Sequence, residues 1–415
     1  MRRRLRVRAR ATVAVLSDAP DGGGTIRAAP TSMTSGVAWP LLLPAFVAGA
    51  IACHDSPVAV PTTPIDAPFV ALSAGALHTC ALTSAGSAYC WGWNRDGELG
   101  DGSTRDLAAP AAVVGPDFRG VAAGGGHTCA TTAGGAMCWG FNLSGQLGDG
   151  SNTRRLTPQA VFGGLDLSAV MAGGAYTCAL AADSTAYCWG WGSGGQLGSG
   201  DRADHTEPTL VPGGVKFVTL STGTVHTCGL AADSTAYCWG RDDFGQLGTT
   251  TPGDTALPAP VAGGVRFRAL AVGYQHSCGL LADGHVRCWG DASLGQLGDS
   301  TLDTLTFTAL AAGAAHTCGL TADGTAVCWG ADASGQLGSP AAELCATGSG
   351  VAPCTPTPTP VATSLKFVQL SGGAQHSCGL TATHQAFCWG LNNHGQLGDG
   401  TTSASVNPVH VANQL

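Results

Sequence analysis

The strongest constraint on the fold is a pair of cysteines that returns seven times along the chain. The first pair lies in HTCALTSAGSAYCWG, residues 78–92, with its cysteines ten positions apart. A Trp-Gly follows the second cysteine of every pair, and a QLG motif (ELG in the first copy) follows each CWG at a fixed distance. A repeat of about 50 residues therefore sets the architecture. The seven pairs are Cys80 with Cys90, Cys129 with Cys138, Cys178 with Cys188, Cys228 with Cys238, Cys278 with Cys288, Cys318 with Cys328 and Cys378 with Cys388.

Each cysteine pair is expected to cross-link a β-hairpin. In CGLTADGTAVCW, residues 318–329, ADG is a three-residue turn whose Gly takes the left-handed position. Counting outward from that turn places Cys318 opposite Cys328 in a non-hydrogen-bonded pair, which is close enough for a disulfide. The second repeat is one residue shorter, yet a two-residue turn again sets Cys129 opposite Cys138. The pairing survives the change in length, which favours disulfides.

A metal site is the weaker interpretation of the same residues. His78 shares a strand face with Cys80, so these two and Cys90 would supply three ligands. The spacing is not that of zinc ligands, and the histidine is Tyr176 in the third repeat. We therefore interpret the repeated histidine as a buried, hydrogen-bonded structural residue, and the repeated Trp as a packing residue between repeats. We interpret the Asp-Gly pairs as residues that favour turns, with calcium binding as the alternative. No cofactor is predicted.

The other cysteines point to export. Cys53 directly follows an apolar run at residues 38–52. This run is too short to span a membrane, but its length suits a secretory signal. The stretch AIAC resembles a bacterial lipobox, in which Cys53 is lipidated; an ordinary cleaved signal or an uncleaved anchor are the alternatives. Cys345 and Cys354 are expected to close a surface loop by a disulfide. This cysteine usage suits an oxidising compartment.

The predicted organisation has three parts. Residues 1–52 form a leader, with Met33 as a possible true start, and residues 53–68 form a Pro/Thr-rich tether. Residues 69–415 form the repeat domain, with an insertion at 339–360. The expected location is extracytoplasmic, as a lipoprotein of the bacterial cell envelope or as a secreted protein. Contact with a membrane is expected only through the N-terminal lipid, and the protein is predicted to be a monomer.

The charge balance argues against nucleic-acid binding. The first 52 residues contain seven Arg and two Asp, so the rest, with 12 basic and 25 acidic residues, carries a net charge of −13. Binding to phosphate backbones needs clustered Lys and Arg. We therefore predict no nucleic-acid partner.

The repeats resemble those of the regulator of chromosome condensation family. The resemblance rests on SAGALHTCALTSAGSAYCWGWNRDGELGDGS (73–103) and LSGGAQHSCGLTATHQAFCWGLNNHGQLGDGT (370–401), and it covers about residues 69–404. It implies an all-β, seven-bladed β-propeller with four-stranded antiparallel blades. A closed ring of repeats also removes open sheet edges, as the physics of such repeats requires.

Three details of the ring are predicted. The sixth repeat lacks the Pro-x-x-Val segment seen at 258–261, so we expect a truncated blade there. The insertion at 339–360 is assigned to the seventh repeat. The C-terminal NPVHVA, 407–412, is expected to pair with the first blade and close the ring.

The predicted function is binding without catalysis. The nucleotide-exchange role of the family's chromatin-bound member is misplaced for an exported, acidic chain, and fold alone is a weak guide to function. Hydrolase and phosphate-binding motifs such as Gly-x-Ser-x-Gly are absent from the sequence, so hydrolase activity is the least favoured hypothesis. The loops vary while the repeat cores do not, which favours a scaffold that binds proteins through its loops. The alternatives are a glycan or peptidoglycan module and a secreted enzyme inhibitor. The candidate binding rim comprises Trp93, Phe141, Trp191, Arg241 and Phe244.

Overall fold

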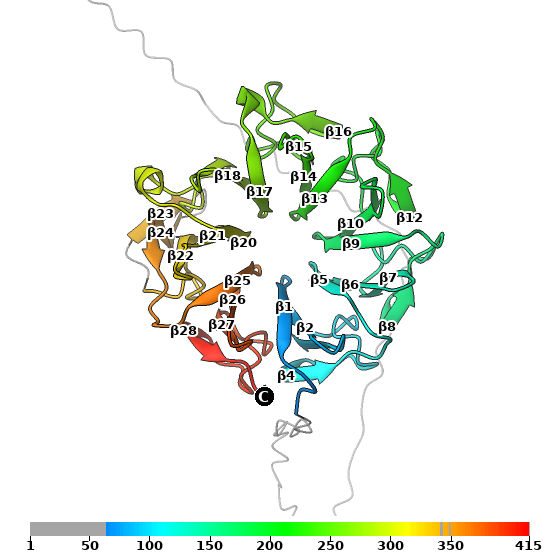
Figure 1. The fold of residues 1–415 in the computed structure, drawn as a ribbon, viewed down its shortest axis with the longest axis horizontal. Helices are drawn as coiled ribbons and strands as arrows, with labels where there is room; N and C mark the ends of the chain where they lie inside the picture. Colours follow the sequence, from blue (N-terminus) through cyan, green and yellow to red (C-terminus); the bar gives the residue numbers. More distant parts are fainter. Residues whose placement is uncertain (1–63, 341–342, 348–349, 415) are drawn as a thin grey trace, which may run out of the picture. The chain divides into compact units, whose positions relative to one another are not determined.

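Seven antiparallel sheets stand around a central axis (Figure 1). The computed structural model describes residues 64–340, 343–347 and 350–414. Cys53, the leader and most of the tether lie outside the described residues. The two helices in the described ranges are the short 3₁₀ helices η1 (Ala262–Gly264) and η2 (Ser300–Thr304), and neither is long enough to cross a membrane. The chain is therefore an all-β, seven-bladed β-propeller.

Blade one shows how the repeat becomes a sheet. Its strands β1 (Phe69–Ala74), β2 (His78–Thr83), β3 (Ala88–Gly92) and β4 (Leu107–Ala112) pair in sequence order, with β1 beside the axis and β4 outermost (Figure 1). The sequence alternates turn residues with short runs of small and β-branched residues, as short strands require. The outer strand β4 has an open edge and carries Pro110, which limits further pairing.

The other blades repeat this order with few changes. Their strands are β5 (Gly120–Ala123), β6 (His127–Thr132), β7 (Gly135–Gly140) and β8 (Arg155–Ala160); β9 (Leu167–Ala172), β10 (Tyr176–Ala181), β11 (Ala186–Gly190) and β12 (His205–Leu210); β13 (Phe217–Thr222), β14 (His226–Ala231), β15 (Ala236–Gly240) and β16 (Thr255–Pro260); β17 (Phe267–Val272), β18 (His276–Leu281) and β19 (Val286–Gly290); β20 (Ala309–Ala312), β21 (His316–Leu320), β22 (Ala326–Ala331), β23 (Glu343–Thr347) and β24 (Gly350–Pro360); and β25 (Phe367–Gly372), β26 (His376–Thr381), β27 (Ala386–Gly390) and β28 (Ser405–His410).

A disulfide staples the central hairpin of every blade. In blade six, Cys318 lies opposite Cys328 in the register expected from the ADG turn. In blade two, the shorter hairpin still sets Cys129 opposite Cys138. All seven staples have Cα atoms 4.1 Å apart. In blade order they join Cys80 to Cys90, Cys129 to Cys138, Cys178 to Cys188, Cys228 to Cys238, Cys278 to Cys288, Cys318 to Cys328 and Cys378 to Cys388.

An eighth disulfide lies in the insertion. It joins Cys345 in β23 to Cys354 in β24, and these two strands pair with each other antiparallel. The prediction of a surface loop closed by this bridge was therefore wrong in one respect, because the segment is a stapled hairpin and not a loop.

The expected truncation is displaced by one blade. Blade five, β17–β19, has three strands, and blade six has five because β24 and β23 extend it. The prediction that blade six would be short was wrong, because the Pro-x-x-Val segment between two repeats forms the outer strand of the preceding blade. Its loss before the sixth repeat therefore removes a strand from blade five. For the same reason, the insertion belongs to blade six and not to the seventh.

The missing strand leaves one staple less covered than the others. Cys288 in β19 is partly exposed, whereas both cysteines of the other six hairpin staples are buried. We expect mild reduction to open Cys278–Cys288 before those six, because thiol–disulfide exchange depends on access. Graded phosphine treatment, alkylation and peptide mass spectrometry would measure the order. Cys228–Cys238 in the complete blade four is the matched control. Simultaneous labelling of both pairs would contradict the prediction.

The ring closes without an exchanged strand. β28 pairs with β27 as the outer strand of blade seven, so the prediction that residues 407–412 join blade one was wrong. Like every Pro-x-x-Val segment, this one completes the blade before it. Blades seven and one instead meet through side chains: Gln369 Oε1 accepts from Leu72 N–H at 3.1 Å, and Ser371 Oγ accepts from Ala74 N–H at 2.9 Å. Closure is therefore a seam between two complete blades.

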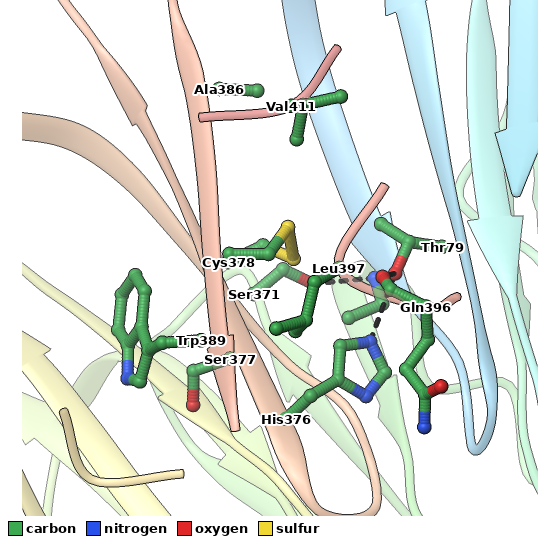
Figure 2. Close-up of a disulfide and its surroundings, with 12 residues drawn as sticks. Thr79, Ser371, His376, Ser377, Cys378, Ala386, Trp389, Gln396, Leu397 and Val411 are labelled. Carbon is green, nitrogen blue, oxygen red and sulfur yellow. Dashed lines mark hydrogen bonds between the residues drawn. A yellow bond between two sulfur atoms is a disulfide. The ribbon is translucent and has the colours of Figure 1, made fainter. Parts of the chain in front are cut away.

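Similar contacts join neighbouring blades around the ring, although Trp239 Nε1 makes no hydrogen bond and Tyr176 replaces the His of blade three. At the seam shown in Figure 2, the carbonyl of Gln396 in the QLG motif of blade seven accepts from Thr79 Oγ1 of blade one at 2.9 Å. The same carbonyl also accepts from Trp91 Nε1 of blade one at 3.0 Å. His376 Nε2 lies 2.9 Å from Thr79 Oγ1. Because the threonine hydroxyl already donates to the carbonyl, the histidine must be the donor, in its Nε2–H form. The repeated His, Trp and QLG residues are thus one interlocking contact between blades.

The final glycine of QLG makes room for the tryptophan of the next blade. Gly398 has φ 72°, and a Cβ there would lie 2.6 Å from Trp91 Nε1. Gly400 also has positive φ, but a Cβ there would have no heavy atom within 4 Å. We expect Gly400→Ala to cost about 1 kcal/mol of unfolding free energy for its backbone. Gly398→Ala should cost about 3 kcal/mol, since overpacking adds to that strain. Urea unfolding of both variants measures the difference, and equal losses would contradict the interlock.

Candidate binding face

The loops of the propeller gather on one end of the ring. In blade one, residues 75–77 join β1 to β2, and residues 93–106 join β3 to β4. Both segments lie at the same end, because His78 pairs with Gly92 and Gly92 pairs with Leu107. We call this end, with its equivalents in every blade, the loop face. The opposite end carries the hairpin turns such as 84–87, and we call it the turn face.

A shared hydrogen-bond frame holds the long loops. In blade one, Asn94 Oδ1 accepts from Leu99 N–H at 2.9 Å, and the Asn94 amide donates to Asp101 Oδ1 at 3.2 Å. Asn142 and Asn392 make the same bonds in their blades. Asp332 takes the place of Asn in blade six; burial raises its pKa to about 6. In these four blades the loops are thus preorganised platforms, because buried polar side chains fix their backbone; blades three and five have Gly192 and Ala292 at this position.

Four of the predicted rim residues occupy equivalent positions on this platform. Each directly follows a CWG, and its backbone N–H donates to the residue before the repeated His or Tyr, as Trp93 does to Leu77 O at 2.9 Å. All four side chains are partly exposed. Phe244 does not share this position: it lies three residues further along its loop and is 48% exposed. The equivalent four are Trp93, Phe141, Trp191 and Arg241.

Trp93 is the centre of a charged cluster at the seam between blades seven and one. Its ring meets His394 edge-on, with centroids 4.3 Å apart, and the Arg95 guanidinium lies 4.6 Å from its centroid. His394 Nδ1 is 2.7 Å from Asp106 Oδ2. The cluster offers a flat aromatic surface with both signs of charge beside it. Such a surface suits polar recognition by an aromatic anchor.

A second cluster spans blades three and four. The Arg241 guanidinium lies 5.8 Å from the centroid of Trp191, and Arg241 Nη1 is 3.7 Å from Asp243 Oδ2. Phe244 follows on the same loop. Trp191 is thus partly covered by the neighbouring blade, while Phe244 is open to a partner.

Sequence reasoning missed the most exposed position of these loops. The third residue after each CWG is exposed in all seven blades, and Leu143 there is 71% exposed. Six residue types occupy the seven positions, while the residue before it is Asn or Asp in five blades, Gly192 in blade three and Ala292 in blade five. The signal that could have found it is the variation between the CWG and QLG motifs, where the first, third and fourth residues after CWG all change from copy to copy. The seven residues are Arg95, Leu143, Ser193, Asp243, Ser293, Ala333 and Asn393.

The mouth of the central channel on this face has few functional side chains compared with the loops. A cavity of about 110 Å³ is lined almost entirely by Ala and Gly, with Thr222, Thr224, Val272 and Tyr274 as the exceptions. Backbone bonds from blade to blade, such as Ala76 N–H to Gly124 O at 3.0 Å and Ala374 N–H to Ala76 O at 3.4 Å, tie its wall together. The side chains that offer chemistry therefore lie on the loops around the channel and not inside it.

The repeated histidines are structural, as predicted. Each is buried and bonded through Nε2 to a Thr or Ser hydroxyl of the next blade, as His127 is to Thr177 at 2.9 Å. Burial lowers the pKa of all six, to about 3 or about 4. In blade three, Tyr176 Oη donates to His226 O at 2.6 Å, so the tyrosine also reaches the next blade. These residues hold the ring and do not face a ligand.

Comparison with known families agrees with the geometry. The profile of the RCC1-like domain matches residues 48–306, and the regulator of chromosome condensation (RCC1) repeat matches 307–336, 367–396, 323–380 and 384–414. The human E3 ubiquitin-protein ligase HERC2 is 41% identical over 64 residues, which is 15% of this chain and 1% of that protein. Human RCC1 domain-containing protein 1 is 45% identical over 58 residues, 14% of this chain and 15% of that protein. The chain thus spans a small part of these relatives.

Solved structures share the whole ring. Prp20p of Saccharomyces cerevisiae, studied for its binding to Gsp1p and histones, superimposes with a TM-score of 0.70 at 23% identity, covering 84% of this chain and 87% of that one. Yeast RCC1 (Prp20) bound to Kap60 gives a TM-score of 0.69 at 22% identity, covering 85% of each chain. Human WBSCR16 gives 0.66 at 21% identity, covering 76% of this chain and 88% of that one. At these identities the likeness shows the fold.

Proposed function

Since this chain belongs to the RCC1-like repeat family, its role should be sought on the surface of a propeller, and we propose that it is an extracytoplasmic module that binds a protein through its loop face. The observation that carries the proposal is the exposed position three residues after each CWG. That position is exposed in all seven blades, and six different residue types occupy it. A surface that varies on a constant scaffold is typical of recognition sites.

The chemistry of the loop face favours a protein partner. Partly exposed Trp93 and Trp191 lie beside arginines, and Leu143 and Phe244 add exposed apolar area on the same face. Aromatic residues and Arg are the commonest anchors of protein interfaces. The turn face is more uniform, because three of its hairpins carry the same ion pair; these pairs are Lys216–Asp183, Arg266–Asp233 and Lys366–Asp323.

The disulfides support the location. Eight disulfides within 415 residues indicate an oxidising compartment, because cytosolic reductants would keep these cysteines reduced. Lipidation of Cys53 would add a membrane anchor. The described chain enters the ring on the turn face, at the start of β1, so an anchor would leave the loop face free. The yeast relative binds proteins, and from it we carry over only the kind of partner.

Site-specific photo-cross-linking in the producing cell would test the proposal. A photoreactive phenylalanine analogue at Leu143, Phe244 or Arg95 should yield a discrete protein adduct. The same analogue at Val218, which is 56% exposed at the turn-face end of an inner strand, is the matched control and should yield none. Equal adducts from both faces would contradict the loop-face assignment. Retention on purified cell-wall glycan without protein adducts would favour the glycan alternative.

A further inference from the structure

Blade five has an open strand edge where every other blade has a fourth strand. β19 ends its sheet, and nothing in the described ranges pairs with its outer side. Trp289 and Cys288 in this strand are partly exposed, whereas the Trp and second Cys of the other blades are buried. No strand of the described part of the chain therefore covers this edge.

The open edge presents unpaired backbone groups. Cys278 and Cys288 face each other with Cα atoms 4.1 Å apart, as a non-hydrogen-bonded pair. In an antiparallel ladder, the N–H and C=O of Cys288 then point away from β18 and toward the open edge. In blade four the equivalent Cys238 pairs with Ala259 of the outer strand β16. The groups that bind a strand in blade four are thus left free in blade five.

The core beneath this edge is complete, so the edge is a surface and not a hole. Leu302 in η2 is 6% exposed and packs with Phe307 and Trp329. It fills the place that the Val of Pro-x-x-Val fills elsewhere, as Val361 does beside Gly338 and Leu302 does beside Gly298. An added strand would therefore supply backbone bonds and surface contacts, and it would not need to enter the core.

The charge of the edge selects what can add to it. Arg287 is exposed in β19, at the position held by Tyr237 in blade four, and it has no ion pair among the described residues. Tyr237 lies opposite Pro260 of the outer strand. A strand on β19 in the same register would therefore set its own residue opposite Arg287. An edge Arg repels basic strands, and it loses hydration without compensation against an apolar strand, whereas an opposite charge across strands stabilises the pair.

We propose that the open edge of β19 is a docking site for an extended acidic segment of a partner protein, which adds to blade five as its fourth strand. The carboxylate of the segment pairs with Arg287, and the next residue along it toward the N-terminus pairs with the backbone of Cys288. Strand addition to an exposed edge gains affinity from main-chain bonds and specificity from the side chains. The proposal does not depend on the loop face.

Blade four supplies the probe. A labelled peptide with the sequence of residues 254–261, but Glu in place of Pro260, should bind the chain from Cys53 onward, with Cys53→Ser to remove the free thiol. The same peptide with Lys at that position should bind roughly three- to tenfold more weakly, the effect of one cross-strand charge reversal. Arg287→Glu should reverse this preference. The variant lies on an exposed position, and its melting temperature controls for folding.

A second readout locates the peptide. The amide of Cys288 should exchange with deuterium faster than that of Cys238 in the free protein, and it should be protected when the Glu peptide is bound. The proposal is overturned if neither peptide binds, if Arg287→Glu leaves the preference unchanged, or if binding protects the loop face and not β19. Self-association of the chain that the Glu peptide does not inhibit would make a second copy the occupant and would also overturn it.

Discussion

Lowering the pH from 7.5 to 5 is expected to unfold the propeller. The six repeated histidines have pKa values of about 3 or about 4 in the folded ring because burial disfavours their charged form, against an ordinary value of 6.5. Below pH 6.5 the unfolded chain takes up protons that the folded chain does not. Folding therefore loses about 1.4 kcal/mol per pH unit at each histidine.

Two carboxyl groups oppose this loss. Burial raises the pKa of Glu98 to about 7 and that of Asp332 to about 6, so the folded state gains stability at these two sites as the pH falls. Six histidines outweigh two acids, and the net loss at pH 5 is on the order of 10 kcal/mol, comparable to the whole stability of a typical domain. Near-UV circular dichroism against pH would measure the transition.

A single substitution gives the matched control. His127→Gln keeps a side-chain N–H that can donate to Thr177 but does not titrate. It should lower the proton uptake on unfolding by one, and so flatten the dependence of stability on pH by about one sixth of the histidine contribution. A melting temperature that changes by only a few degrees between pH 7.5 and 5 would contradict the assignment of these histidines.

Full reduction of the disulfides is expected to prevent folding altogether. Each of the seven staples closes a loop of nine or ten residues and contributes about 2.5 kcal/mol by restricting the unfolded chain. Seven together contribute about 17 kcal/mol, which exceeds the 5 to 15 kcal/mol of a typical domain. The reduced, alkylated chain should therefore show tryptophan emission at the wavelength of a solvent-exposed indole.

Partial reduction is the control for this experiment. Opening only Cys278–Cys288 and Cys345–Cys354, whose Cys288 and Cys345 are partly exposed, should leave the ring folded, because six buried staples remain. A fully reduced chain that keeps buried tryptophans would show that the interlock of Trp, Thr and QLG is sufficient alone.

The sequence predicted the repeat unit well because its signals are local. The ADG turn and the cysteine spacing determine a hairpin register within a dozen residues, and that register was confirmed in blades two and six. The recurring His and Trp were correctly read as contacts between repeats. Local signals of this kind need no knowledge of what lies across the ring.

The errors arose where a strand had to be assigned to one of two blades. A Pro-x-x-Val segment lies between two hairpins, and neither spacing nor composition says which hairpin it joins. That choice depends on the direction in which the loop after CWG returns along its own sheet, as Gly240 pairing with Thr255 shows. The same ambiguity misplaced the short blade, the insertion and the C-terminal strand.

The rim was predicted only as a position. The sequence analysis put Trp93, Phe141, Trp191, Arg241 and Phe244 on one rim, and the structure sets the first four in equivalent places. Phe244 lies three residues further along its loop. The sequence could not show that Trp93 contacts His394, because those residues are 301 positions apart and come together only when the ring closes. Whether the rim binds a partner stays a prediction.

The seam between blades seven and one has a consequence for how such chains can change. Each blade is built only from strands that are consecutive in the sequence. Ile65 N–H donates to Asn413 O at 3.1 Å, so the two ends of the described chain meet at one junction of the same kind as the others. A ring built in this way can begin at any blade: joining the ends and cutting at another connector would produce the same seams in a new order. It can also gain or lose a whole unit by gene duplication or deletion, since no strand crosses from one unit to complete another.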